Sequence, residues 1–137
     1  MGEERIALMI GILVISETRA AMEMLKSVKK VLGASVLPGI QALSIPSDLT
    51  GRTLKNKINT AIRELAVTDG VVILTELYGS TPSNICQDFL CPGDVELVSG
   101  YNLPMLLKAA TKNTEMQLTD LVTCLKETGQ RCIQTFS

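Results

Sequence analysis

Apolar residues along this chain group into short continuous runs, which are separated by longer segments of mixed polarity. Ile6–Ile15 and Gly70–Thr75 are apolar on both faces of an extended chain, which is typical of strands buried inside a parallel sheet. Two shorter strands are predicted around Ile40–Ile45, which Pro46 ends, and at Val95–Val98. The pattern therefore predicts four strands spread over most of the chain.

The segments between these strands carry apolar residues at helical spacing. The predicted helices are Ala21–Leu32, Leu54–Leu65, Leu103–Ala110 and Met116–Lys126. Gly33 and Gly129 are placed to end the helices before them, and Pro82 suits the first position of another short helix. Arg131–Phe136 is expected to form a fifth, peripheral strand at the C-terminal end.

Strands and helices thus alternate with short connections. This order favours an α/β fold with a doubly wound, mainly parallel four-stranded sheet and helices on both faces. We expect the strand order 2-1-3-4. No linker, internal repeat or low-complexity segment interrupts residues 1–137, so we expect them to form one domain.

The charge and the aromatic content of the chain exclude several classes of function. Thirteen Lys and Arg against fourteen Asp and Glu give a net charge of −1, and the chain has two Tyr, two Phe and no Trp. Neither a basic stripe nor an aromatic platform for nucleic acid is present. The chain also lacks histidine, which excludes a Ser-His-Asp or Cys-His nucleophile, histidine metal ligands and phosphoryl transfer through an imidazole.

Four cysteines occupy positions whose spacing does not suggest a zinc ribbon. Cys86 and Cys91 are separated by four residues, and Cys124 and Cys132 by seven, so free thiols are favoured over a metal site. The apolar run near the start is too short to span a bilayer and follows acidic residues, unlike a signal peptide. We therefore expect a cytoplasmic protein that needs no metal or cofactor and does not insert into membranes.

The predicted topology also indicates where a site should lie. In doubly wound sheets, ligands bind beyond the carboxyl ends of the strands where the strand order reverses, here between strands one and three. Ser16-Glu17-Thr18 leaves strand one, and Glu76–Asn84 leaves strand three, so these loops should face one crevice. The second loop offers backbone and hydroxyl donors for an anion, although its hydroxyls could equally be helix caps. These candidate donors belong to Gly79, Ser80, Thr81 and Ser83.

Three motifs in these regions closely resemble the mannose-family EIIA domain of the bacterial sugar phosphotransferase system (PTS). They are M-I-G-I-L-V-I-S at residues 9–16, D-G-V-V-I-L-T-E-L-Y-G-S-T-P-S-N at 69–84 and V-E-L-V-S-G-Y-N-L-P-M-L-L at 95–107. The three motifs occur in the family's order and span almost the whole chain. The resemblance implies a PTS component involved in carbohydrate uptake or its regulation.

In that family a histidine accepts a phosphoryl group from the carrier protein HPr and passes it to the EIIB domain. The resemblance puts this histidine at Glu17, its orienting acid at Glu76 and a glycine of the phosphate-binding turn at Ser80. It also implies that Ser16, Thr18, Tyr101 and Asn102 lie at the edge of the site. The chain therefore resembles an EIIA domain without the phosphorylated histidine, with HPr-like or EIIB-like partners.

Several functions fit this departure from the family pattern. Glu17 could imitate phosphohistidine as a fixed negative charge in a regulatory or binding module, or it could have arisen by drift. Alternatively, Glu17 and Glu76 could form the carboxylate pair of an enzyme, or another residue could carry the phosphoryl group. The family forms homodimers, in some members by exchanging a C-terminal strand. Residues 131–136 lie in the matching place, and their sequence fits a retained or an exchanged strand.

Overall fold

A four-stranded parallel sheet forms the centre of the molecule. The computed structural model describes residues 8–65, 69–77 and 79–137. The strands are β1 (Gly11–Ser16), β2 (Ile40–Ser44), β3 (Val71–Thr75) and β4 (Val95–Ser99). They pair side by side in the order β2-β1-β3-β4, which confirms the predicted topology and leaves β2 and β4 as the edges. Ile6 and Ala7 of the first predicted strand lie outside the described residues.

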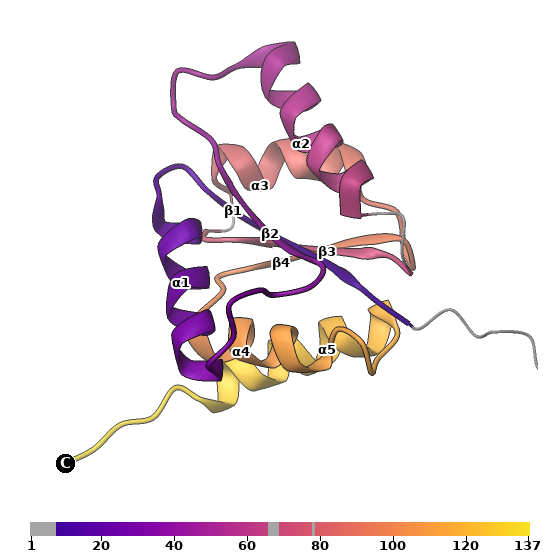
Figure 1. The fold of residues 1–137 in the computed structure, drawn as a ribbon. Helices are drawn as coiled ribbons and strands as arrows, with labels where there is room; N and C mark the ends of the chain where they lie inside the picture. Colours follow the sequence, from indigo (N-terminus) through magenta and orange to yellow (C-terminus); the bar gives the residue numbers. More distant parts are fainter. Residues whose placement is uncertain (1–7, 66–68, 78) are drawn as a thin grey trace, which may run out of the picture.

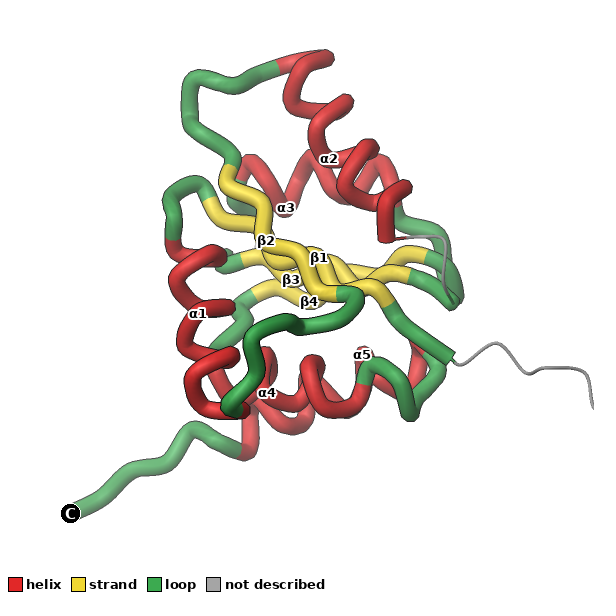
Figure 2. Tube along the Cα trace, viewed as in Figure 1, coloured by secondary structure: helices red, strands yellow, loops and turns green. Residues whose placement is uncertain are grey.

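Helices cover both faces of the sheet, as expected for a doubly wound fold (Figures 1 and 2). One face carries α1 (Ala20–Leu32), α4 (Leu103–Lys112) and α5 (Leu118–Arg131). The other carries α2 (Gly51–Leu65), α3 (Thr81–Cys86) and a 3₁₀ turn at Gln87–Phe89. None of the helices in the described part of the chain is long and apolar enough to cross a membrane.

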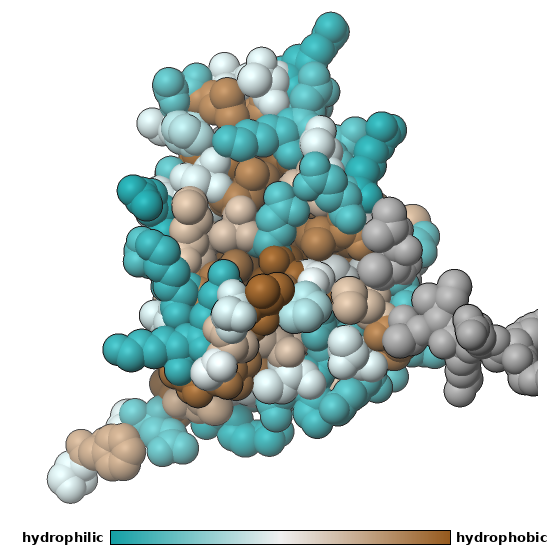
Figure 3. All heavy atoms as spheres, viewed as in Figure 1, coloured by the Kyte–Doolittle hydropathy of each residue, from teal (hydrophilic) through white to brown (hydrophobic). Residues whose placement is uncertain are grey.

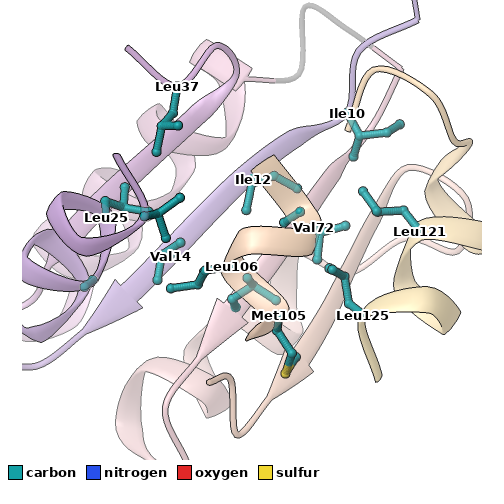
Figure 4. Close-up of a cluster of buried hydrophobic side chains, with 14 of the residues drawn as sticks. Ile10, Ile12, Val14, Leu25, Leu37, Val72, Met105, Leu106, Leu121 and Leu125 are labelled. Atoms are coloured by element: carbon teal, nitrogen blue, oxygen red, sulfur yellow. The ribbon is translucent and has the colours of Figure 1, made fainter. Parts of the chain in front are cut away.

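Alternate residues of the central strands enter two separate apolar layers. Ile12 and Val14 of β1 pack under α1, α4 and α5, whereas Leu13 and Ile15 pack against the α2 and α3 side. Figure 4 shows the first layer, in which Leu106 of α4 points towards the strands. These side chains are inaccessible to solvent or nearly so. Burial on both faces is the physical reason for the continuous apolar run in β1.

The C-terminal part of the chain differs from the prediction in two ways. Gly129 does not end α5 but lies buried within it, and the helix continues to Arg131. A β-carbon built on Gly129 would lie 2.5 Å from Met105 Sδ, so glycine permits close packing of α5 on α4. The second difference is that residues 132–137 form no strand in this chain, and Arg131, at which the strand was expected to begin, belongs to α5.

The residues after α5 extend away from the body of the molecule (Figure 1). Ile133 and Phe136 are 74% and 91% exposed, which is unusual for large apolar side chains. The predicted strand is therefore wrong for a single copy of the chain. Exchange of this segment between two copies stays a prediction.

Candidate functional site

Hydroxyl groups fix the loop that follows β1. Ser16 Oγ is buried; it accepts a hydrogen bond from the Ala21 N–H at 2.9 Å and donates to the Thr18 carbonyl. Ser44 Oγ, at the end of β2, donates to the same carbonyl at 2.9 Å. Ser16 and Thr18, both predicted to edge the site, thus hold the backbone on either side of Glu17, whose own side chain is exposed.

Glu17 lines a pocket of about 150 Å³ that two helix N-termini also line. Thr50 immediately precedes α2 and Leu54 lies in its first turn, while Thr81 and Pro82 are the first two residues of α3. Neither helix has an acidic residue in its first turn. Helix N-termini carry partial positive charge, so the Glu17 carboxylate supplies the negative charge that this pocket favours.

Two backbone donors of the turn before α3 form hydrogen bonds within the turn. Ser80 is the N-cap of α3, where its Oγ accepts from the Ser83 N–H at 3.3 Å, and its own N–H donates to the Leu77 carbonyl. Pro82, at the second helical position and not the first, has no N–H. Thr81 keeps an N–H with no partner among the described residues. The predicted anion loop therefore caps α3 through Ser80, and among the described residues the N–H groups of Gly79 and Thr81 have no partner.

Gly79 and Ser83, the remaining members of that predicted loop, have different environments. Gly79 is exposed with a φ of +83°, and its carbonyl accepts from the Asn84 side chain at 3.2 Å. Ser83 is 1% exposed, and its Oγ has no hydrogen-bond partner within the described part of the chain. Gly79 thus permits the left-handed turn before α3, and neither residue lines the Glu17 pocket.

Glu76 and Tyr101 form a second group beside the first. Glu76 follows β3 and is exposed, but it does not line the Glu17 pocket. The Tyr101 N–H donates to the Thr75 carbonyl, and the buried Tyr101 hydroxyl has no hydrogen-bond partner in residues 8–65, 69–77 and 79–137. Burial, and secondarily the negative charge of Glu76, raises the pKa of Tyr101 to about 12. Tyr78, also expected near the crevice, lies outside the described residues.

Asn102 joins two helices. Its Oδ1 accepts from the Met105 N–H and caps α4, while its Nδ2 donates to the Gly129 carbonyl at 3.1 Å. It lines a different pocket, of about 380 Å³, between β4 and α5. These two bonds join α4 to α5, and Asn102 does not line the Glu17 pocket.

The connection from β2 to α2 contributes residues that the sequence analysis did not select. Ser47 and Thr50 line the Glu17 pocket, and Ser44 holds the Glu17 loop. The predicted order put β2 beside β1, so their carboxyl ends were expected to be neighbours. These residues carry no recognisable motif, which is why that order alone did not single them out.

The cysteines are free thiols in different environments. Cys86, the last residue of α3, is buried in the apolar layer beneath the helix, and this burial raises its pKa to about 12. Cys91 and Cys132 are exposed, and Cys124 is half-buried. Within the described ranges, no three Cys, Asp or Glu side chains lie close enough to hold a metal ion.

The fold and the motifs match a known protein family. A family model for the PTS system fructose IIA component, EIIA-man, matches residues 11–126. The chain belongs to this family. The matched segment runs from β1 into α5 and includes Glu17, Glu76 and the turn before α3. The resemblance to the mannose-type EIIA domain is thereby confirmed at the level of the family.

Relatives of this EIIA-family chain include longer proteins. The PTS system fructose-specific EIIA component of Bacillus subtilis is 29% identical over 87 residues, which are 63% of this chain and 60% of that protein. The PTS system mannose-specific EIIAB component of Escherichia coli strain K12 is 26% identical over 127 residues, which are 91% of this chain and 39% of that protein. The matched part is thus less than two thirds of either relative.

Solved structures support the fold. The mannose/sorbose-specific IIA subunit from Enterococcus faecalis superposes with a TM-score of 0.81 at 23% identity, covering 95% of this chain and 96% of that one. A PTS IIA protein associated with the fucose utilization operon of Streptococcus pneumoniae gives 0.79 at 22% identity, with 94% of each chain covered. At these identities the likeness shows a shared EIIA fold.

Proposed function

We propose that this chain is a cytoplasmic, single-domain regulatory or binding module of the sugar PTS, in which Glu17 occupies the position of the phosphoryl-acceptor histidine. Family membership supports the PTS assignment, and the absence of histidine from the sequence supports the loss of phosphoryl transfer. The observation that carries the proposal is the position of Glu17 in a pocket lined by the N-terminal ends of α2 and α3.

In this proposal, the Glu17 carboxylate acts as a permanent anion. A carboxylate supplies a charge of −1 and two oxygens, whereas a phosphoryl group supplies about −1.5 to −2 and three oxygens. Its negative charge is complementary to the two helix N-termini, and Thr81 provides a backbone donor at the pocket. The chain would thus present one fixed charge state to HPr-like or EIIB-like partners.

The alternative of an enzyme with paired carboxylates has less support. Only Glu17 of the two acids lines the pocket, while Glu76 lies near Tyr101. General acid–base catalysis needs both groups within reach of one substrate. The regulatory or binding proposal requires only Glu17.

Binding to HPr tests the role of the charge. Isotope-labelled HPr would be titrated with the parent chain, Glu17→Gln and Glu17→His. A fixed-anion role predicts that Glu17→Gln changes the Kd by about threefold or more, because one charge at a contact is worth roughly 1 kcal/mol. Equal Kd values for the parent and Glu17→Gln would favour drift at this position. An exposed acid far from the pocket, changed in Glu64→Gln, is the charge-matched control.

We also propose that the chain forms a homodimer through its C-terminal segment. The edge strand β4 lies between two pockets of about 380 and 270 Å³, and Ile133 lines the larger one. An added strand would place alternate side chains towards the two faces of the sheet. The exposed side chains of Ile133 and Phe136 could occupy such positions when the C-terminal segment of one copy pairs with β4 of a second copy.

Light scattering after gel filtration tests the dimer. The parent should have twice the monomer mass, and Ile133→Asp/Phe136→Asp should shift the distribution towards monomer. Gln134→Asp is a control that adds charge to the same segment without removing an apolar side chain. A monomeric parent would contradict the homodimer but would leave the Glu17 proposal intact.

A further inference from the structure

Charge is divided unevenly between the two halves of the molecule. Residues 18–65 contain eight Lys and Arg but three Asp and Glu. Residues 69–137 contain four Lys and Arg but eight Asp and Glu. The first segment forms α1, β2 and α2, and the second forms the elements from β3 to α5. Because the strand order is β2-β1-β3-β4, the basic half surrounds the edge strand β2. An acidic partner would therefore be attracted to this edge.

The outward side of β2 is open at Ala42, between the Ile40 N–H, which donates to the Leu37 carbonyl, and the Ser44 carbonyl, which accepts from Lys57. Gly39 O accepts from the Ile12 N–H, and the Ile45 N–H donates to Ser16 O, each at 2.8 Å. Odd-numbered residues of β2 therefore pair with β1, and the N–H and C=O of Ala42 point away from it. An edge of this kind can accept another strand.

Apolar and basic side chains border this edge together. A groove of about 350 Å³ between α1 and β2 is lined by Met22, Leu25, Lys26 and Lys29 and by residues 40–42. Met22 is 39% exposed. Figure 3 shows hydrophobic surface over β2 and its preceding loop, with hydrophilic side chains over α1 at the left. The groove thus offers apolar contact beside positive charge.

A further lysine lies on the opposite face of the sheet. Lys57 of α2 donates to the Ser44 carbonyl at 3.2 Å, so basic residues from both faces flank β2. Lys26 lies 3.1 Å from Glu23, but both side chains are more than half exposed, and such a pair is worth little. A carboxylate from a partner can therefore compete for Lys26.

We infer that the β2 edge binds an extended acidic segment of a partner protein, which adds to the sheet as a fifth strand. The Ala42 backbone supplies hydrogen bonds, the groove takes apolar side chains, and carboxylates on the two faces of the added strand pair with the lysines of α1 and α2. Lysines also protect edge strands from unwanted pairing. The same lysines attract an acidic strand, because its charges are opposite, so this edge should select acidic strands over others. The surface is distinct from the Glu17 pocket, so this inference goes beyond the proposed function.

A model peptide tests the inference. The full chain, labelled with ¹⁵N, would be titrated with acetyl-Val-Glu-Glu-Val-Glu-Glu-Val-Thr-amide up to about 1 mM, a range that detects weak binding. The glutamates of this peptide lie on both faces of an extended strand. Saturable shifts in β2 and α1 are expected. Lys26→Glu/Lys29→Glu should weaken binding by about tenfold or more, and Lys108→Glu/Lys126→Glu, which makes the same charge change over α4 and α5, by less than about twofold.

Ala42→Pro separates strand addition from general charge attraction. Proline removes the outward N–H of an edge strand, where it can be tolerated without loss of a ladder bond. Strand addition predicts that this variant binds the acidic peptide about tenfold more weakly, while its NMR spectrum remains that of a folded protein. Unchanged affinity, equal binding of the peptide with lysine in place of glutamate, or no saturable shift would each overturn the inference. Stronger binding of a single-stranded oligonucleotide than of the acidic peptide would also overturn it.

Discussion

Glu17 brings a single acidic side chain to the ends of two helices. Its backbone is held by Ser16, Thr18 and Ser44, while the side chain remains at the pocket. The sequence located Glu17 because it follows an unmistakable buried strand at a predicted switch point. The contribution of Ser47 and Thr50 could not be predicted, because it depends on how the β2–α2 connection folds back over the pocket.

Removing the charge of Glu17 should weaken the fold slightly. An acid near a helix N-terminus contributes about 0.3–1 kcal/mol, so Glu17→Gln should lower the free energy of unfolding by that amount. Urea denaturation at low salt measures it. Glu64→Gln, near the C-terminal end of α2, should cause no such loss. A Glu17→Gln variant as stable as the parent, or more stable, would contradict the electrostatic account of the pocket.

Tyr101 should make stability depend on alkaline pH. Its pKa rises from the ordinary value of 10.0 to about 12 in the folded chain, first through burial and then through Glu76. The neutral phenol is favoured in the folded state, so this stabilisation is present below pH 10 and is lost as pH rises through 12. Denaturation across this range should show a smaller decline for Tyr101→Phe than for the parent. If the stability of Tyr101→Phe and of the parent declined equally, the raised pKa of Tyr101 would be contradicted.

Among the elements, the central strands could be predicted and the C-terminal end could not. Continuous apolar runs at β1 and β3 fixed their type, because only burial on both faces favours such runs. Gly129 was misassigned because glycine ends many helices, while its actual role depends on contact with Met105 from a different helix. Asn102 resembled a site residue, yet it caps α4 and bonds to α5. Local sequence does not reveal such contacts between helices.

The contact between Gly129 and Met105 leads to a prediction about stability. Gly129→Val should cost about 1–3 kcal/mol, because the added side chain must displace Met105 from a well-packed interface. Combined with Met105→Ala, the loss should be less than additive by about 0.5 kcal/mol or more. Denaturation of the two single variants and the double variant provides the comparison. Strict additivity would show that the two residues do not pack as described.

At the scale of the whole molecule, an EIIA-family fold combines a pocket without histidine with an uneven distribution of charge. Glu17 lines the pocket at the starts of α2 and α3, where we propose that it holds the acceptor position, while the basic half of the chain lies around β2. A chain that presents a fixed charge at the pocket can bind partners without taking part in phosphoryl transfer. The central claim is therefore that Glu17 holds the acceptor position and cannot carry the phosphoryl group.

The most direct test is phosphoryl transfer followed by intact mass. The parent chain and Glu17→His would each be incubated with phosphoenolpyruvate, enzyme I and HPr. The account predicts that the parent keeps its mass and that Glu17→His gains one phosphoryl group, because imidazole restores the acceptor. A phosphorylated parent would contradict the claim that this chain carries no phosphoryl group. An unmodified Glu17→His, correctly folded and exposed to active HPr, would contradict the assignment of Glu17 to the acceptor position.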